Sequence, residues 1–232
     1  MSEQTLARGR FVVFEGGEGA GKSTQARRLV SWLAACGYDV RTTREPGATP
    51  LGARIRELLL EPAGDPPSPR AEALLYAADR AHHVSTVIRP ALAEGAVVVC
   101  DRYVDSSLAY QGAGRALPAD EIAWLSQWAT AGLRPDLVIL LDVDPRLGMA
   151  RIGDRGAADR LESESAEFHA RVRQAFGELA AAEPRRYLVL DAALSTDELA
   201  ARIRDRITPL LPPAPAPPVT ESRAAGRSEV AQ

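Results

Sequence analysis

The residues FVVFEGGEGAGKST, positions 11–24, join an apolar run to a glycine-rich loop and the start of a helix. The apolar run, 11–14, predicts a short buried strand, and residues 16–23 match the pattern G-x-x-x-x-G-K-[ST]. Glycines let the backbone curl so that successive N–H groups point at phosphate oxygens, and the following helix start adds positive potential. The sequence therefore predicts a P-loop that binds a nucleoside triphosphate.

Two side chains of this loop have distinct expected roles. Lys22 is expected to reach the β- and γ-phosphates, and the Ser23 hydroxyl to ligate Mg²⁺. A glycine-rich turn without a ligand is the alternative, which the strand before the loop and the helix after it argue against. The predicted ATP-binding residues are Gly16, Gly17, Glu18, Gly19, Ala20, Gly21, Lys22, Ser23 and Thr24.

Length and charge narrow the class of protein. The chain has 232 residues, enough for one sizeable α/β domain, and a net charge of -3, which argues against a nucleic-acid-binding surface. No apolar run approaches a membrane span and the first residues do not resemble a signal peptide, so a cytoplasmic protein without a membrane partner is expected. Cys36 and Cys100 are expected to be buried free thiols.

Apolar strands alternate with helical stretches along the chain. The predicted strands are 11–15, 39–43, 96–100, 137–141 and 187–190. The predicted helices are 23–36, 50–60, 70–94, 118–130, 163–183 and 196–210. Such a pattern indicates an α/β fold with a parallel sheet covered on both faces, which binds ligands beyond the carboxyl ends of its strands. We expect one domain over 9–210, an N-terminal extension over 1–8 and a Pro/Ala-rich disordered tail over 211–232.

Charged residues follow the predicted strands. Asp101 leaves the third strand and can hold Mg²⁺ in the manner of a Walker B carboxylate, and Arg102 is a planar cation suited to phosphate. A surface Asp–Arg pair is the alternative. Arg151 and Arg155 are four residues apart and Arg160 follows them, which is typical of a mobile lid over transferring phosphates or of a solvated charge run.

Residues 9–210 contain several short motifs that are informative through their order and spacing. They are Phe14-Glu15-Gly16, the P-loop, Thr43-Arg44-Glu45-Pro46-Gly47, Asp101-Arg102-Tyr103 with Ser106, Ala109-Tyr110-Gln111-Gly112, and Asp159-Arg160-Leu161-Glu162. In this order and spacing the chain resembles the thymidylate kinases of many bacteria.

The resemblance implies a fold and a reaction. The fold is that of a P-loop nucleoside monophosphate kinase, a three-layer α/β/α structure with a five-stranded parallel sheet and a short lid near 149–162. The reaction is phosphorylation of dTMP to dTDP with ATP and Mg²⁺, a step towards dTTP for DNA synthesis. A homodimer is expected on the same ground.

The resemblance also assigns residues around the phosphate and sugar of the acceptor. Glu18 matches the acid near the sugar 3′-hydroxyl, and Arg102 matches the arginine that clamps the dTMP phosphate. Arg56 and Arg44 are weaker candidates at that end. Tyr110 is similar to the tyrosine that fills the space of a ribose 2′-hydroxyl and so selects deoxyribose.

Other assignments concern the base and the metal. Arg80 matches the arginine that hydrogen-bonds a thymine carbonyl, and Tyr76 stands where an aromatic ring stacks on the base. Core packing is the alternative for Tyr76 and Tyr110. The expected substrate-binding residues are Glu18, Arg56, Tyr76, Arg80, Arg102, Ser106, Ser107, Tyr110 and Gln111, and the expected metal ligands are Ser23, Asp101 and Glu45.

The expected catalysis needs cations more than a base. A phosphate monoester is already an anionic nucleophile at neutral pH, because its second pKa is about 6. One family branch has a P-loop arginine after the acid, but here Gly19 occupies that position, so Arg155 is the first choice for the missing charge. The expected catalytic residues are Lys22, Arg155, Arg151, Arg160, Asp101 and Glu18.

Three rival functions remain open at the level of sequence. Another nucleotide or nucleoside kinase is the nearest. A regulatory GTPase would need a guanine-reading N-K-x-D element, whereas Leu-Asp-Val-Asp follows the fourth predicted strand at 141–144. A P-loop ATPase would hydrolyse ATP without an acceptor.

Overall fold

The computed structural model describes residues 9–61, 65–153 and 159–212. Five parallel strands form one sheet with the order β2-β3-β1-β4-β5. The strands are β1 (Arg10–Glu15), β2 (Val40–Arg44), β3 (Val97–Asp101), β4 (Leu137–Asp142) and β5 (Tyr187–Asp191). The predicted parallel sheet is confirmed, and each strand begins and ends within one residue of its predicted bounds.

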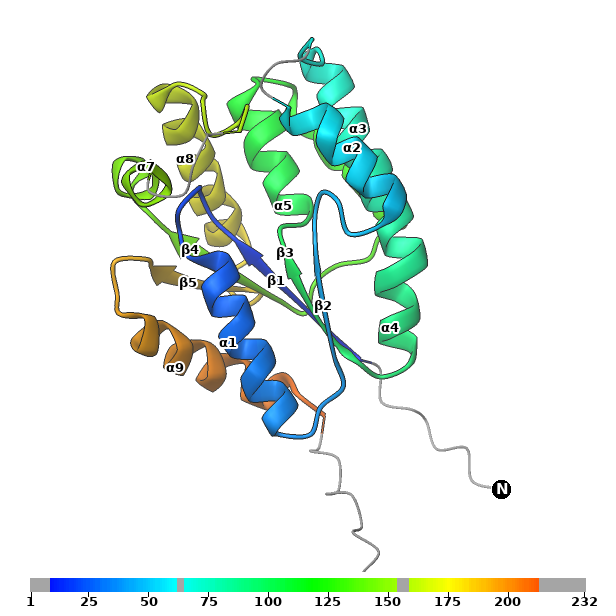
Figure 1. The fold of residues 1–232 in the computed structure, drawn as a ribbon, viewed down its shortest axis with the longest axis vertical. Helices are drawn as coiled ribbons and strands as arrows, with labels where there is room; N and C mark the ends of the chain where they lie inside the picture. The colour runs from blue at the N-terminus through cyan, green and yellow to red at the C-terminus, as the bar shows by residue number, and fades with distance from the viewer. Residues whose placement is uncertain (1–8, 62–64, 154–158, 213–232) are drawn as a thin grey trace, which may run out of the picture.

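Helices cover both faces of this sheet (Figure 1). The α-helices are α1 (Lys22–Ala35), α2 (Pro50–Leu60), α3 (Pro69–His83), α4 (Arg89–Ala93), α5 (Val104–Ser107), α6 (Ala119–Thr130), α7 (Pro145–Gly153), α8 (Ala166–Ala182) and α9 (Thr196–Ile207). Helices α1 and α9 pack together below the sheet in the view of Figure 1, and α4 and α8 pack against β3 and β4 from the other side. The predicted three-layer arrangement is confirmed.

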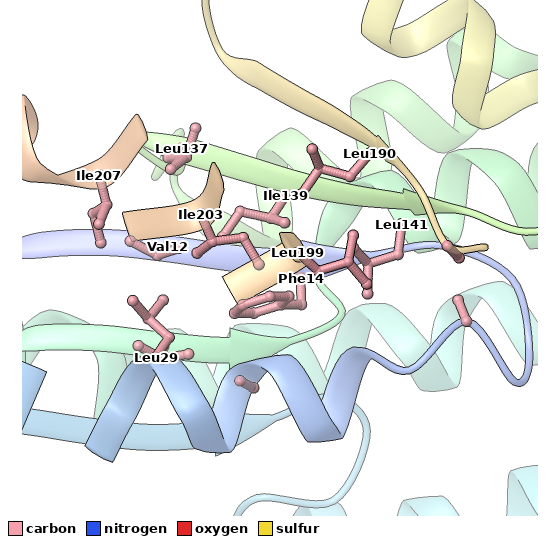
Figure 2. Close-up of a cluster of buried hydrophobic side chains, with 14 of the residues drawn as sticks. Val12, Phe14, Leu29, Leu137, Ile139, Leu141, Leu190, Leu199, Ile203 and Ile207 are labelled. Carbon is pink, nitrogen blue, oxygen red and sulfur yellow. The ribbon is translucent and has the colours of Figure 1, made fainter. Parts of the chain in front are cut away.

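The apolar strands divide their side chains between these two layers, because successive residues of a strand point to opposite faces. Val12 and Phe14 of β1 face α1 and α9, where Leu29 and Ile203 complete a core (Figure 2). Phe11 and Val13 belong to a second cluster on the opposite face, with the helical segment before β3. The continuous apolar runs of the sequence therefore mark strands that are buried on both faces.

Some predicted elements differ in detail. The predicted helix 70–94 consists of α3, a π-helical turn η1 (Val84–Ile88) and α4, and α8 begins three residues later than predicted. Helix α5 and the π-helical turn η2 (Leu108–Gly114) were missed because small and polar residues hide their helical pattern. The 3₁₀ turn η3 (Thr208–Leu210) ends the last predicted helix. Cys100 is buried as expected, but Cys36 is exposed, because it lies at the C-terminal end of α1.

The strand order places the ligand-binding edge next to β1. The chain passes from β1 to β2 and β3 on one side of β1 and then crosses to β4 and β5 on its other side, and such a switch point opens a crevice at the carboxyl ends. In the parallel register Phe14 pairs with Asp101, so the P-loop and the end of β3 lie side by side. The expected residue Arg155, the expected N-terminal extension 1–8, and all of the expected tail 211–232 except its first two residues lie outside the described residues.

Candidate active site

A cleft of about 740 Å³ lies at the carboxyl ends of the strands. It is lined by the P-loop, the loop after β2, the start of the segment after β3, and α3. The sequence-predicted residues on its wall are Glu18, Gly19, Ala20, Gly21, Lys22, Ser23, Thr24, Glu45, Arg56, Tyr76, Arg80, Asp101, Arg102, Ser106, Ser107, Tyr110 and Gln111. Arg44 also lines the cleft, and this exposed side chain has no hydrogen bond or ion pair to any described residue.

The P-loop folds around its own lysine. Lys22 Nζ donates to the carbonyl oxygens of Gly16 at 3.0 Å and Gly17 at 2.9 Å, which leaves one ammonium proton for a ligand. Gly21 has φ 92°, a left-handed conformation that glycine adopts without steric cost, and α1 begins at the next residue. Burial lowers the pKa of Lys22, while Glu18 and Asp101 favour its charged form. The loop therefore presents a buried cation and a helix N-terminus to the cleft.

Two oxygen ligands lie where a magnesium ion could be held. Ser23 Oγ donates to Asp101 Oδ2 at 3.0 Å. Neighbouring ligands of an octahedral Mg²⁺ site with bonds of ~2.1 Å are ~3.0 Å apart, so these two atoms fit adjacent positions. Among residues 9–61, 65–153 and 159–212 there is no cluster of three or more His, Cys, Asp or Glu side chains that could hold a metal. This matches an ion held by one carboxylate and by substrate phosphates.

Beside the lysine, Glu18, Arg102 and Tyr110 form a polar triad. Arg102 Nη2 and the Tyr110 hydroxyl both donate to Glu18 Oε1, the hydroxyl at 2.8 Å. Burial by itself would raise the pKa of Glu18, but Arg102, Lys22 and the Tyr110 hydrogen bond lower it to about 2. Glu18 is thus ionised at neutral pH, where it accepts hydrogen bonds but is a poor proton acceptor.

Arg102 is held in an unusual backbone conformation. Its φ of 69° lies in the left-handed region, which costs a non-glycine residue about 1–2 kcal/mol. Its N–H donates to the Phe14 carbonyl at 2.9 Å, and its Nη1 donates to Gly16 O and Ser106 Oγ. Together with the Nη2 bonds, these contacts leave Nε–H as the guanidinium donor without a partner among the described residues. Strain kept at one cleft residue is typical of a functional site.

The buried carboxylate of Glu15 holds this turn and was missed at the level of sequence. Its Oε1 accepts from the backbone N–H groups of Tyr103 at 2.9 Å and Ser106 at 3.1 Å, and its Oε2 accepts from Ser106 Oγ at 2.6 Å. Burial, followed by the nearby Asp105, raises the pKa of Glu15 to about 7. A glutamate that ends an apolar strand, directly before the P-loop, was the available signal.

The expected base-binding residues form the far wall of the cleft. Tyr76 is 8 % exposed and packs with apolar residues of α2 and α8. Arg80 is 1 % exposed, and it donates to Glu45 Oε2 at 2.6 Å, Ser107 Oγ at 2.9 Å and the Tyr103 carbonyl at 3.0 Å. Two N–H groups of Arg80 have no partner among the described residues and are available to a ligand. Tyr76 and Arg80 both line the cleft, so the structure brings these two expected residues together.

Glu45 does not fit the expected role of metal ligand. One carboxylate oxygen accepts from Arg80 Nε and the other is 2.9 Å from His83 Nδ1. Thr43 Oγ1 is 2.6 Å from the other ring nitrogen of His83. The carboxylate is 2 % exposed and is occupied by these partners. We therefore correct the expectation: Glu45 orients Arg80 under the cleft.

The expected lid arginines have different surroundings. Arg151 Nη2 donates to the Ala192 carbonyl at 3.0 Å, which brings α7 to the loop after β5. Arg160 faces away from the cleft, because its Nε donates to Leu59 O at 2.7 Å and its Nη2 to Glu72 Oε2 at 2.6 Å. The expectation that Arg160 is catalytic does not agree with this placement; it anchors the segment that follows residue 158.

A backbone contact explains why Gly19 stands where another family branch has arginine. Gly19 has φ +68°, and a Cβ there would lie 2.1 Å from the Gly148 carbonyl of α7. A Cβ on Gly148 would in turn lie 2.2 Å from the Glu18 carbonyl. Helix α7 therefore packs on the P-loop backbone itself. No side chain fits at position 19 while α7 lies here. The positive charge that an arginine at this position supplies in the other family branch therefore has to come from another part of the chain.

Fold and site together define a P-loop nucleoside monophosphate kinase, because one cleft joins a triphosphate loop to a second, aromatic- and arginine-walled pocket. A family model described as Thymidylate kinase matches residues 14–203. The chain is 60 % identical over 203 residues to the thymidylate kinase of Cutibacterium acnes, covering 88 % of this chain and 98 % of that one. It is 54 % identical over 198 residues to that of Deinococcus radiodurans, covering 85 % and 96 %.

A solved structure agrees with these sequence matches. The crystal structure of thymidylate kinase from Ehrlichia chaffeensis superposes with a TM-score of 0.69 at 29 % identity, covering 85 % of this chain and 98 % of that one. The chain belongs to the thymidylate kinase family. It is accordingly a transferase of the kinase class.

Proposed function

We propose that the protein binds ATP and dTMP end to end in this cleft and transfers the γ-phosphoryl group directly between them. The reaction is phosphorylation of dTMP to dTDP. The observation that supports the arrangement is that Lys22, Ser23 and Asp101 line the same cleft as Glu18 and Arg102. Holding two polyanions in line, and neutralising the charge between them, is most of the work of phosphoryl transfer.

The chemistry of this transfer needs no general base. The attacking oxygen belongs to a phosphate monoester, which is already anionic near pH 7 because its second pKa is about 6. The carboxylate of Glu18, with a pKa of about 2, stays ionised and orients Arg102 and Tyr110. No described residue that lines the cleft is a histidine. Transfer in line without a base is therefore the mechanism that fits these groups.

On the donor side, Lys22 and the loop amides bind the triphosphate. Ser23 and Asp101 are the residues that would hold Mg²⁺, which supplies charge neutralisation on the phosphate oxygens when bound. Arg151 lies beside the Ala192 carbonyl and is placed to border the nucleoside of ATP. Arg155 supplies positive charge to the transferring phosphoryl, a contribution of ~10³ or more in rate for an arginine in this role.

On the acceptor side, different residues of the cleft bind the phosphate, the sugar and the base of dTMP. Arg102, through its Nε–H, and the guanidinium of Arg44 attract the phosphate, since neither group has a partner among the described residues. Tyr110 is buried against Phe168 and Phe176, with ring centroids 6.0 and 6.3 Å apart, so its ring cannot yield to a ribose 2′-hydroxyl. Tyr76, Arg80, Gln111 and Ser107 surround the base, and Arg56 closes the side near the Pro46 carbonyl.

The protein acts as a homodimer in the cytoplasm. Two indole rings on α6 support the dimer, Trp124 at 65 % and Trp128 at 71 % exposed, stacked at an interplanar angle of 9°. Leu74, 58 % exposed, lies on α3, which packs against α6. Large exposed aromatic patches mark protein interfaces. No described helix is long and apolar enough to cross a membrane.

A coupled ADP-release assay across the nucleoside monophosphates, with ATP and Mg²⁺ constant, tests the proposal. Turnover that depends on dTMP supports it. Preference for another monophosphate would favour a different nucleotide kinase, and ADP release without any acceptor would favour an ATPase. Omission of Mg²⁺ should abolish turnover if Ser23 and Asp101 hold the ion.

A further inference from the structure

Glu72, in the first turn of α3, is a buried carboxylate that phosphoryl transfer does not use. Its side chain is 0 % exposed, and it lies one helical turn before Tyr76. Burying an ionised carboxylate is costly unless opposite charges and hydrogen bonds compensate for it. The groups that compensate here identify what the carboxylate holds in place.

Three side chains from two separate segments donate to this one carboxylate. Gln111 Nε2 donates to Oε1 at 2.9 Å, Arg115 Nε donates to Oε1 at 3.2 Å and its Nη2 to Oε2 at 3.1 Å, and Arg160 Nη2 donates to Oε2 at 2.6 Å. Burial by itself would raise the pKa of Glu72, but the bonds from Arg115, Gln111 and Arg160 lower it, so the group is ionised. Glu72 therefore joins η2 to the segment after residue 158.

The charge of Glu72 determines which way the Gln111 amide points. An ionised carboxylate only accepts hydrogen bonds, so Gln111 must turn its NH₂ group to Glu72. Gln111 Oε1 has no hydrogen-bond partner within residues 9–61, 65–153 and 159–212, and Gln111 lines the cleft. The amide is thus left with an acceptor for the bound base.

We propose that Glu72 is a positioning residue for base selection, because it locks the Gln111 amide with Oε1 available to the acceptor nucleotide. A pyrimidine with a ring N–H at position 3, as in thymine, can donate to this oxygen. Cytosine has a lone pair at the same position and meets a second acceptor, which is repulsive. This inference rests on the proposed placement of the base against Gln111.

The Glu72→Gln variant tests the lock. Its amide can both donate and accept, so Gln111 is free to turn over and to present NH₂ to the cleft. We expect the ratio of kcat/KM for dTMP to that for dCMP to fall about tenfold, the worth of one hydrogen bond. The KM for ATP should stay within about twofold, because the P-loop is not touched. A purely structural role would lower both activities together and leave the ratio unchanged.

Two further variants serve as control and safeguard. Glu164→Gln removes the other carboxylate on Arg115, whose Nη1 lies 2.5 Å from Glu164 Oε1, but it touches neither Gln111 nor Arg160, so the ratio should not move. Glu72→Asp keeps the negative charge, but its shorter side chain moves the carboxylate away from Gln111. This variant tests the role of Glu72 if Glu72→Gln does not fold. An unchanged ratio in a folded Glu72 variant overturns the inference.

Gln111→Leu separates this failure from failure of the proposed base placement. If Gln111→Leu leaves the dTMP/dCMP ratio unchanged, the base does not lie against Gln111, and both the placement and the inference fall. If Gln111→Leu collapses the ratio and neither Glu72 variant does, the placement stands and only the role of Glu72 is refuted.

Discussion

Single residues of the acceptor pocket combine packing with recognition. Tyr110 is the clearest case, because its ring is wedged between α8 aromatics while its hydroxyl donates to Glu18 at 2.8 Å. The core-packing alternative therefore holds for this side chain, and it is compatible with the functional one, which stays a prediction. A ring fixed by packing on two sides excludes an extra hydroxyl group better than a mobile ring could.

Tyr110→Ala should erode discrimination against ribonucleotides about tenfold or more, since the space of the ring becomes available to a 2′-hydroxyl. Comparison of kcat/KM for dTMP and its ribose counterpart measures this. Tyr110→Phe is the matched control, because it keeps the ring and loses the bond to Glu18. Equal discrimination in all three proteins would refute the steric argument.

Arg155→Ala should lower kcat ~10³-fold with a much smaller change in KM for ATP, because the arginine acts on charge that develops during transfer. Steady-state kinetics with saturating dTMP measures both constants. Arg146→Ala removes an exposed arginine at the start of α7 and is expected to be neutral. Undiminished turnover of the Arg155 variant would exclude it from this role.

At the scale of elements, the site depends on two contacts of the segments that bound the P-loop. Helix α7 packs on it through Gly148, and β1 ends in Glu15, which holds the backbone of the segment from Tyr103 to Ser106. Neither Gly148 nor Glu15 is itself among the residues expected to bind substrate. Both determine where the groups that do touch substrate lie.

Gly148→Ala should destabilise the protein by about 1–3 kcal/mol and reduce kcat/KM, because its Cβ would lie 2.2 Å from the Glu18 carbonyl and force α7 off the P-loop. Urea unfolding and steady-state kinetics report the two effects. The control is Gly153→Ala in the same helix, where a Cβ meets no atom of the described residues within 4 Å; it should stabilise by about 0.5–1 kcal/mol. Similar behaviour of both variants would contradict the packing argument.

Glu15→Gln should stabilise the protein above pH 7 and have little effect near pH 4. The folded-state pKa of Glu15 is raised from 4.5 to about 7, so the folded state binds the extra proton and loses stability as pH rises through this range. A neutral amide escapes this penalty, which amounts to ~3 kcal/mol for a shift of this size. Urea midpoints of both proteins at pH 4.5 and pH 8 give the difference; a constant difference would refute the shift.

At the scale of the whole molecule, the exposed apolar side chains are unevenly distributed. Seven large apolar side chains are exposed among the described residues, and five of them lie on α2, α3 and α6. These helices pack against one another, α2 on α3 and α3 on α6. None of these five side chains lines the cleft, although α2 and α3 do so through Arg56, Tyr76 and Arg80, so a partner that covers them would leave the cleft accessible.

The double variant Trp124→Asp/Trp128→Asp should sediment at the mass of one chain, whereas the unchanged protein should sediment at twice that mass. Two buried carboxylates would cost more than the apolar contact they replace. Val189→Asp, at a 52 % exposed position on β5, is the control and should remain a dimer. A single-chain mass for the unchanged protein, across micromolar concentrations, would refute the dimer.

Local patterns in the sequence determined most of the fold and the location of the site. The P-loop, the five apolar strands and the residues directly after them depend on short-range spacing, and a parallel sheet brings the ends of its strands to one edge. Lys22, Ser23 and Asp101 could be assigned in this way because each belongs to a motif of a few residues.

Only the tertiary structure decided which charges pair across the molecule. Arg160 binds Glu72 from 88 positions away, so this residue, predicted to be catalytic, instead holds its segment in place. Arg80 binds Glu45 from 35 positions away, so Glu45, predicted to be a metal ligand, instead orients Arg80. No local spacing encodes such pairs. They follow from the cost of burying an unpaired charge, which is settled only once the packing of helices and loops determines which charges are buried together.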